Sequence, residues 1–94
     1  MVLFTLADQG LKYKLLKDKH TWKEAINMQD DEWYLPSSTE LEPLRECLHQ
    51  FANYWTFEES ADDKHFAITY EPLYGHRGYQ IKRAFESVVL FPKK

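Results

Sequence analysis

The chain has 94 residues, of which 44% are hydrophobic, 16% aromatic and 29% charged, with a formal net charge of −3. This length predicts one domain, residues 1–94, and so many aromatic residues exclude an intrinsically disordered chain. The twelve basic residues are scattered among fifteen acidic ones. Nucleic-acid-binding proteins usually carry a basic surplus on one face, so we expect no nucleic-acid partner.

The N-terminal segment and the cysteine content bear on the compartment. The only cysteine is Cys47, which excludes an internal disulfide and favours a reducing environment. The apolar run at residues 2–6 has no basic leader and is soon followed by Asp8, so we expect no signal peptide. No run approaches the roughly 20 apolar residues that span a bilayer. These features predict a cytoplasmic protein with no membrane contact, including one of phage or accessory origin.

The first two elements in the chain are expected to be strands at residues 2–6 and 11–16. The tripeptide Asp8-Gln9-Gly10 between them is typical of a turn. In the second strand Tyr13 and Leu15 alternate with lysines, as expected for one buried and one solvated face. We therefore predict an N-terminal hairpin.

A short helix is expected at residues 22–28. Thr21 and Glu24 have the spacing of a capping box, in which each side chain accepts a hydrogen bond from the backbone of the other residue. Two turns are too few to be stable alone, so tertiary packing must hold this helix. Its apolar side would consist of Trp22, Ala25, Ile26 and Met28.

A second helix is expected after Leu35-Pro36, where the proline keeps the preceding residue extended. Two capping boxes are available, Ser37 with Glu40 and Thr39 with Glu42. A helix that starts at Ser37 would place Pro43 deep enough to remove an internal hydrogen bond. We therefore favour Thr39 as the cap, or a tightened first turn from Ser38, with the helix continuing to about residue 50. Its buried stripe would comprise Leu41, Leu44, Leu48 and Phe51, with Cys47 as a small buried side chain at the edge.

The rest of the chain is expected to form strands, at residues 54–57, 65–70, 78–84 and 88–91. A turn at residues 60–63 separates the first two. Gly75 and Gly78 are expected to bracket a second turn. The last strand is continuously apolar, as in a fully buried strand.

Five segments in this order resemble a bacterial family of C-type-lectin-like domains, which includes the C-terminal domain of a collagen-like adhesin. The resemblance covers roughly residues 8–91 and implies an α+β fold. In that fold two helices pack on small twisted, mostly antiparallel sheets, and the N- and C-terminal strands lie together. Tyr34 replaces the family's usual arginine, Phe57 replaces a serine, and the closing arginines are absent. The matching segments are Gly10-Leu11-Lys12-Tyr13, Thr21-Trp22-Lys23-Glu24-Ala25, Trp33-Tyr34-Leu35-Pro36-Ser37 with Glu40-Leu41, Tyr54-Trp55-Thr56 with Glu58 or Glu59, and Lys82 before Val88-Val89-Leu90.

The matched residues are interpreted as core rather than as a site, because large rings between helices and sheets bury well and their polar atoms can find backbone partners. The expected structural core is Trp22, Trp33, Leu35, Pro36, Leu41, Tyr54 and Trp55.

No pattern in the chain predicts catalysis, a metal or a cofactor. The calcium-binding motifs of true C-type lectins are not reproduced by Glu71-Pro72-Leu73 or by Asn53-Tyr54-Trp55. Cys47 is alone, which argues against the copper-binding cysteine pair of the lectin-like formylglycine-generating oxygenases. The four histidines lack zinc-ligand spacing, and phosphate-loop, dinucleotide and nucleophile-elbow motifs do not occur. We therefore expect a protein that is not an enzyme.

The segment at residues 71–79 is the best candidate for ligand binding. We expect Tyr74, His76, Arg77 and Tyr79 to be presented from a loop to a protein or a glycan, because loops on rigid scaffolds often bind ligands and tyrosine and arginine often anchor interfaces. A plain hairpin turn, whose tyrosines shield its base, is the alternative for this segment. For the whole protein the alternative is a structural or assembly component, either phage-associated or self-associating into a homo-oligomer.

Overall fold

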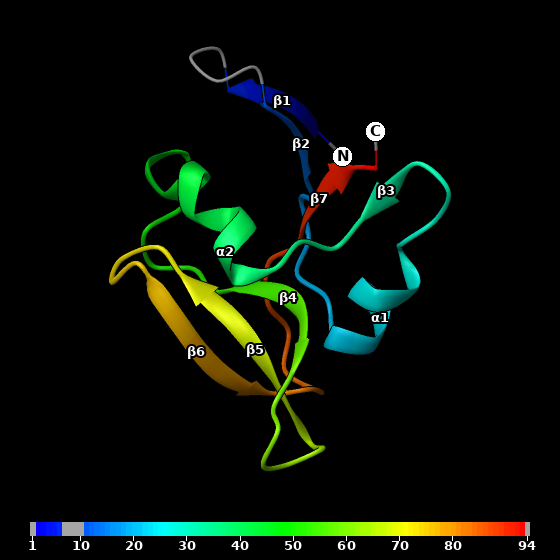
Figure 1. The fold of residues 1–94 in the computed structure, drawn as a ribbon, viewed down its shortest axis with the longest axis vertical. Helices are drawn as coiled ribbons and strands as arrows, with labels where there is room; N and C mark the ends of the chain where they lie inside the picture. The colour runs from blue at the N-terminus through cyan, green and yellow to red at the C-terminus, as the bar shows by residue number, and fades with distance from the viewer. Residues whose placement is uncertain (1, 7–10, 94) are drawn as a thin grey trace.

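The computed structural model describes residues 2–6 and 11–93. It is an α+β structure with two short α-helices and two small antiparallel sheets (Figure 1). This confirms the α+β part of the predicted fold class. The elements are β1 (Val2–Leu6), β2 (Leu11–Leu15), α1 (Trp22–Asn27), β3 (Trp33–Tyr34), α2 (Ser38–Leu41), the 3-10 helix η1 (Glu42–Cys47), β4 (Tyr54–Glu59), β5 (Phe66–Glu71), β6 (His76–Ile81) and β7 (Val89–Pro92).

One sheet joins the two ends of the chain. Its strand order is β1-β2-β7-β3, and all neighbouring strands are antiparallel. The predicted N-terminal hairpin is confirmed, with Val2 opposite Leu15, while its predicted turn at residues 8–10 lies outside the described residues. Figure 1 shows β2 and β7 side by side. The N- and C-terminal strands therefore lie together, as the resemblance implied.

The other sheet is the meander β4-β5-β6. The prediction that Gly75 and Gly78 bracket a turn is wrong, because the turn covers residues 72–75 and Gly78 pairs with Thr69 inside β6. Gly75 has a φ of +67°, which favours glycine. A Cβ at Gly78 would lie 2.0 Å from Oε2 of Glu71, so a larger residue there would require the Glu71 carboxylate to move. The strand ends at Ile81 rather than near residue 84, where the amide of Ala84 donates to the Ile81 carbonyl (2.9 Å) and forms a turn.

The two α-helices begin at capping boxes. At α1 the predicted box is confirmed, with the Glu24 amide 3.3 Å from Thr21 Oγ1 and the Thr21 amide 3.0 Å from Glu24 Oε1. At α2 the cap is Ser37 with Glu40, so the prediction of Thr39 is wrong. The helix begins at Ser38, as in the alternative, but its first turn is α-helical rather than tightened. The α-helical turn ends at Leu41, and the chain continues as η1 with the proline in its first turn. Pro43 therefore interrupts no α-helical hydrogen bond, and the objection to Ser37 does not apply.

The predicted helix to about residue 50 is too long. Helical structure ends at Cys47, and Leu48 is already extended with φ −91° and ψ 157°. Leu41, Leu44 and Leu48 are buried as expected, but Phe51 is 80% exposed because it lies after the helix. The expectation of a buried Cys47 is also wrong, since this thiol is exposed.

Among the residues whose burial the structure describes, the core has two parts, separated by β4. Tyr54 packs with Leu41, Leu44 and Tyr70 in one cluster, whereas the adjacent Trp55 packs in the other, because neighbouring side chains on a strand point to opposite faces. The ring nitrogen of Trp55 donates to the His20 carbonyl (2.7 Å). The second cluster also contains buried Ala25, Leu35, Val88 and Leu90, with partly buried Trp22 and Trp33 packed against it.

Candidate functional site

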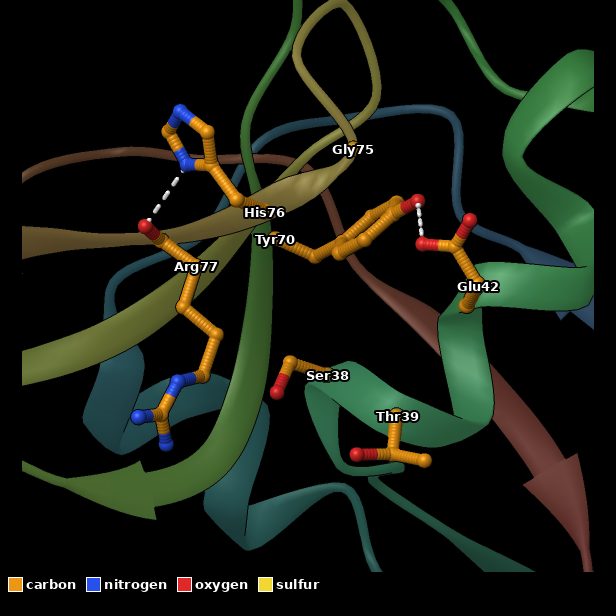
Figure 2. A pocket seen from close by; sticks show the side chains of 7 residues that line it. All are labelled: Ser38, Thr39, Glu42, Tyr70, Gly75, His76 and Arg77. Carbon is orange, nitrogen blue, oxygen red and sulfur yellow. Dashed lines mark hydrogen bonds between the residues drawn. The ribbon is translucent and has the colours of Figure 1, made fainter.

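A hollow of about 370 Å³ lies between the start of the second helical segment and the β5–β6 hairpin (Figure 2). We call it the α2 groove. Because two chain segments about 30 residues apart form its walls, it exists only in the folded protein. Its lining residues are Ser38, Thr39 and Glu42 on one side, and Tyr70, Gly75, His76 and Arg77 on the other.

The strand register decides which side chains face this groove. Tyr70 and Arg77 are opposite each other in the β5–β6 pair, so both project from the same face of the sheet. Arg77 Nη1 lies 3.8 Å from Oε2 of Glu58, whose Oε1 accepts a hydrogen bond from the Ser38 amide (3.0 Å). Glu58 thus connects the first turn of α2 with the guanidinium. The Arg77 side chain remains 57% exposed, so a ligand can reach it.

Tyr70 and Glu42 form another part of the groove's lining and are joined by a short hydrogen bond. The hydroxyl of Tyr70 donates to Oε1 of Glu42 over 2.6 Å (Figure 2). Burial, and after it the bond to Glu42, raises the pKa of the Tyr70 phenol, so the phenol is protonated at neutral pH. One carboxylate oxygen of Glu42 is therefore satisfied within the protein.

The hairpin turn is held against η1 by an arginine that the sequence analysis did not single out. Arg45 Nε donates to the Pro72 carbonyl (2.7 Å), and Nη2 donates to the Leu73 carbonyl (3.1 Å). The guanidinium lies so close to the turn that a Cβ at Gly75 would be 2.6 Å from Nη1. Arg45 therefore positions the turn, and no local sequence signal connects it to residues 27 or more positions later.

The structure brings three of the four predicted binding residues together. Arg77 lines the groove with its side chain, whereas Figure 2 shows the His76 ring pointing away from Ser38 and Thr39. Nδ1 of His76 is 2.9 Å from the Arg77 carbonyl and 3.6 Å from Oε1 of Glu71. The ring of Tyr74 stacks on the His76 ring, with centroids 5.3 Å apart and an interplanar angle of 9°. The sequence analysis treated this segment as one loop, but His76 and Arg77 belong to a strand.

The fourth predicted residue, Tyr79, is not part of the groove. It lies two residues beyond Arg77 on the same face of β6 and is 60% exposed. The groove residues that the sequence analysis missed are Ser38, Thr39, Glu42 and Tyr70. Ser38, Thr39 and Glu42 were considered only for their part in starting a helix. No pattern relates them to Tyr70, because the contact depends on how the helical segment packs on the sheet.

The groove offers hydrogen-bond donors and acceptors but no metal site. Among residues 2–6 and 11–93, no group of three or more His, Cys, Asp or Glu side chains is placed to hold a metal ion. None of the helices in the described part of the chain has the length and apolar character that crossing a bilayer requires. The arrangement is chemically suited to holding a polar ligand by hydrogen bonds.

Comparisons with known protein families, with curated proteins and with solved structures give no match for this chain. The functional assignment therefore depends on the geometry and chemistry of the groove.

Proposed function

We propose that this protein is a non-enzymatic binding module that holds a glycan in the α2 groove. The observation that carries this proposal is the mixture of groups in one hollow. It combines the exposed guanidinium of Arg77 and hydroxyl of Thr39 with the carboxylate of Glu42 and the largely buried hydroxyl of Ser38. Sugar hydroxyls both donate and accept hydrogen bonds, so a glycan can bond to donors and acceptors in this groove.

Size and shape also favour a ligand with a few sugar rings at most. A volume of about 370 Å³ lies within the range of small-ligand sites. On the hairpin beside the groove, the stacked rings of Tyr74 and His76 offer a flat surface on which the C–H face of a sugar can pack. The 66% exposure of Tyr74 leaves this surface open.

The groove is largely preorganised, which favours binding. Glu58, Arg45 and the Tyr70–Glu42 pair hold α2, the turn and the sheet together before any ligand arrives. A site that is already ordered loses less conformational entropy on binding.

The lectin-like scaffold is part of the same proposal. It is supported by the five matched segments, by the pairing of β2 with β7, and by the burial of Leu35, Pro36 and Trp55. A protein ligand that inserts a polar side chain into the groove is the alternative within this class.

A structural or assembly role is the second candidate function, and one observation favours it. In the described part of the chain, β6 pairs only with β5, which leaves six residues with an open strand edge. Such an edge can pair with a second copy. Sedimentation would then show an oligomer that persists on dilution, and a monomer at all concentrations would reject this role.

The binding proposal is tested by a glycan-array screen followed by calorimetry with the best hit. Arg77→Ala should weaken binding by at least about tenfold, because it removes charge-assisted hydrogen bonds. Tyr74→Ala should also weaken binding, since it removes the packing surface beside the groove.

The matched control is Lys64→Ala, which removes one exposed cation from the turn between β4 and β5 and should leave affinity unchanged. All three variants should keep the wild-type melting temperature. An array without any hit, or equal affinities for wild type and Arg77→Ala, would refute the glycan assignment.

A further inference from the structure

A second hollow, of about 560 Å³, lies at the other end of β6. Its lining residues are Thr21, Trp22 and Lys23 at the start of α1, and Lys82 and Arg83 just after β6. We call it the α1 hollow. The six residues of β6 separate it from the α2 groove by roughly 20 Å of extended chain. The backbone amide of Trp22 donates to the Lys82 carbonyl (3.0 Å), which fastens the two walls together.

The wall of this hollow is mainly apolar and its shape is fixed by Trp22. The indole packs against the second core cluster, and its ring nitrogen donates to the Thr56 carbonyl (2.8 Å). The ammonium of Lys82 lies 4.5 Å from the indole ring centroid, so its aliphatic stem extends the apolar surface. A flat apolar group can therefore rest against a preformed wall.

The rim of the hollow carries unpaired positive charge. Lys23 and Arg83 are exposed, and within the described part of the chain neither has an ion-pair or hydrogen-bond partner for its side chain. The third cation, Lys82, has its Nζ 2.5 Å from Oε2 of Glu59. The rim is therefore positively charged, although the net charge of the whole chain is −3.

The nearby carboxylates do not cancel this charge. Glu24 accepts a hydrogen bond from the Thr21 amide and lies 3.4 Å from Nδ1 of His20, so it is occupied by the helix cap. Glu59 has Lys82 as its partner. Two cations therefore remain available to an anion.

From these observations we propose that the α1 hollow binds a small organic anion that carries a flat apolar group. The oxyanion would accept hydrogen bonds from Lys23 and Arg83, and the apolar group would pack on Trp22 and the stem of Lys82. A phosphate ester and a carboxylate share this chemistry. The volume of the hollow is within the range of small-molecule sites.

The test uses four probes on the full chain: 2-naphthyl phosphate, 2-naphthoate, 2-naphthol and inorganic phosphate. Binding is followed by nuclear magnetic resonance, through the indole N–H signal of Trp22 and the backbone signals of residues 21–23 and 82–83. At least one naphthyl anion should shift these signals in a saturable way, and the tighter one identifies the head group. 2-Naphthol and inorganic phosphate should each bind more weakly, because 2-naphthol lacks the anionic group and phosphate lacks the flat apolar group. The proposal would be overturned if 2-naphthol or inorganic phosphate bound as tightly as the tighter naphthyl anion.

Three substitutions and one control substitution sharpen this test. Arg83→Ala and Lys23→Ala should each weaken binding by about twofold to fivefold, the usual range for an exposed charge. Glu59→Gln should strengthen binding, because it releases Lys82 from its competing partner, and a merely structural surface would not respond in this direction. Lys64→Ala, which removes a cation elsewhere, should have no effect.

Unchanged affinity in both Arg83→Ala and Lys23→Ala, with melting temperatures equal to that of wild type, would overturn the assignment. The glycan experiment at the α2 groove reports on different residues, so either proposal can fail without the other.

Discussion

Aromatic side chains are used in two ways in this protein. Tyr54 and Trp55 on β4 belong to the core, whereas Tyr74 and Tyr79 of the β5–β6 hairpin lie on the surface. Trp55 is completely buried and donates to a carbonyl, and the Tyr54 hydroxyl accepts a hydrogen bond from the His49 amide (2.9 Å). Tyr74 and Tyr79 are 66% and 60% exposed. Aromatic content alone therefore does not separate scaffold from binding surface in this chain.

The difference follows from what covers each face of the three-stranded sheet. β4 has helical segments on one side and the second core cluster on the other, so both of its first side chains are enclosed. β6 is at the edge of the sheet, and most of its side chains are exposed. Changes in the first region should lower stability, while changes in the second should affect binding and leave stability intact.

The largest expected effect is that of Trp55→Ala. It removes a fully buried indole and its hydrogen bond, so we expect a loss of about 3–5 kcal/mol in the free energy of unfolding. The control is Phe57→Ala on the same strand, where half the side chain is already exposed and the loss should be much smaller. Urea denaturation measures both. Equal losses for the two variants would contradict the division into buried and exposed aromatics.

Gly78→Ala is expected to be the exception within the hairpin. The added Cβ would lie 2.0 Å from Oε2 of Glu71, so the carboxylate must turn away, and we expect a cost of about 1–2 kcal/mol. The neighbouring substitution Tyr79→Ala should change stability by no more than about 0.5 kcal/mol. Adding Glu71→Ala to Gly78→Ala should recover part of the loss if the overlap is its cause. Additive losses in the double variant would reject that cause.

The smallest effect concerns the cap that positions the α2 groove. Ser37→Ala should lower the free energy of unfolding by about 1 kcal/mol, because it removes the hydroxyl that accepts from the Glu40 amide (3.1 Å). Thr39→Ala is the matched control, with an exposed hydroxyl inside the helix, and its effect should be close to zero. Thermal denaturation separates the two. The reverse order would mean that the helix begins at Thr39 in solution.

The capping boxes show where sequence reasoning succeeds and fails. At α1 a single box was available, and the prediction was confirmed. At α2 two boxes competed, and Pro43 was expected to decide between them, but the change to a 3-10 helix removed its influence. Whether a helix continues as α or 3-10 depends on what it packs against, and this is a tertiary effect.

The chain by itself determined the N-terminal hairpin, the first helix cap and the main strands, because these depend on local spacing and alternation. The α+β class was expected only from the family resemblance. It also indicated His76 and Arg77 as candidate binding residues. Only the tertiary structure decided that Arg77 lines one groove with Ser38, Thr39 and Glu42, that Tyr79 lies outside this groove, and that Trp22 and Arg83 border a second hollow. Each of these outcomes depends on strand register and on packing between distant segments, for which no short sequence pattern carries a signal.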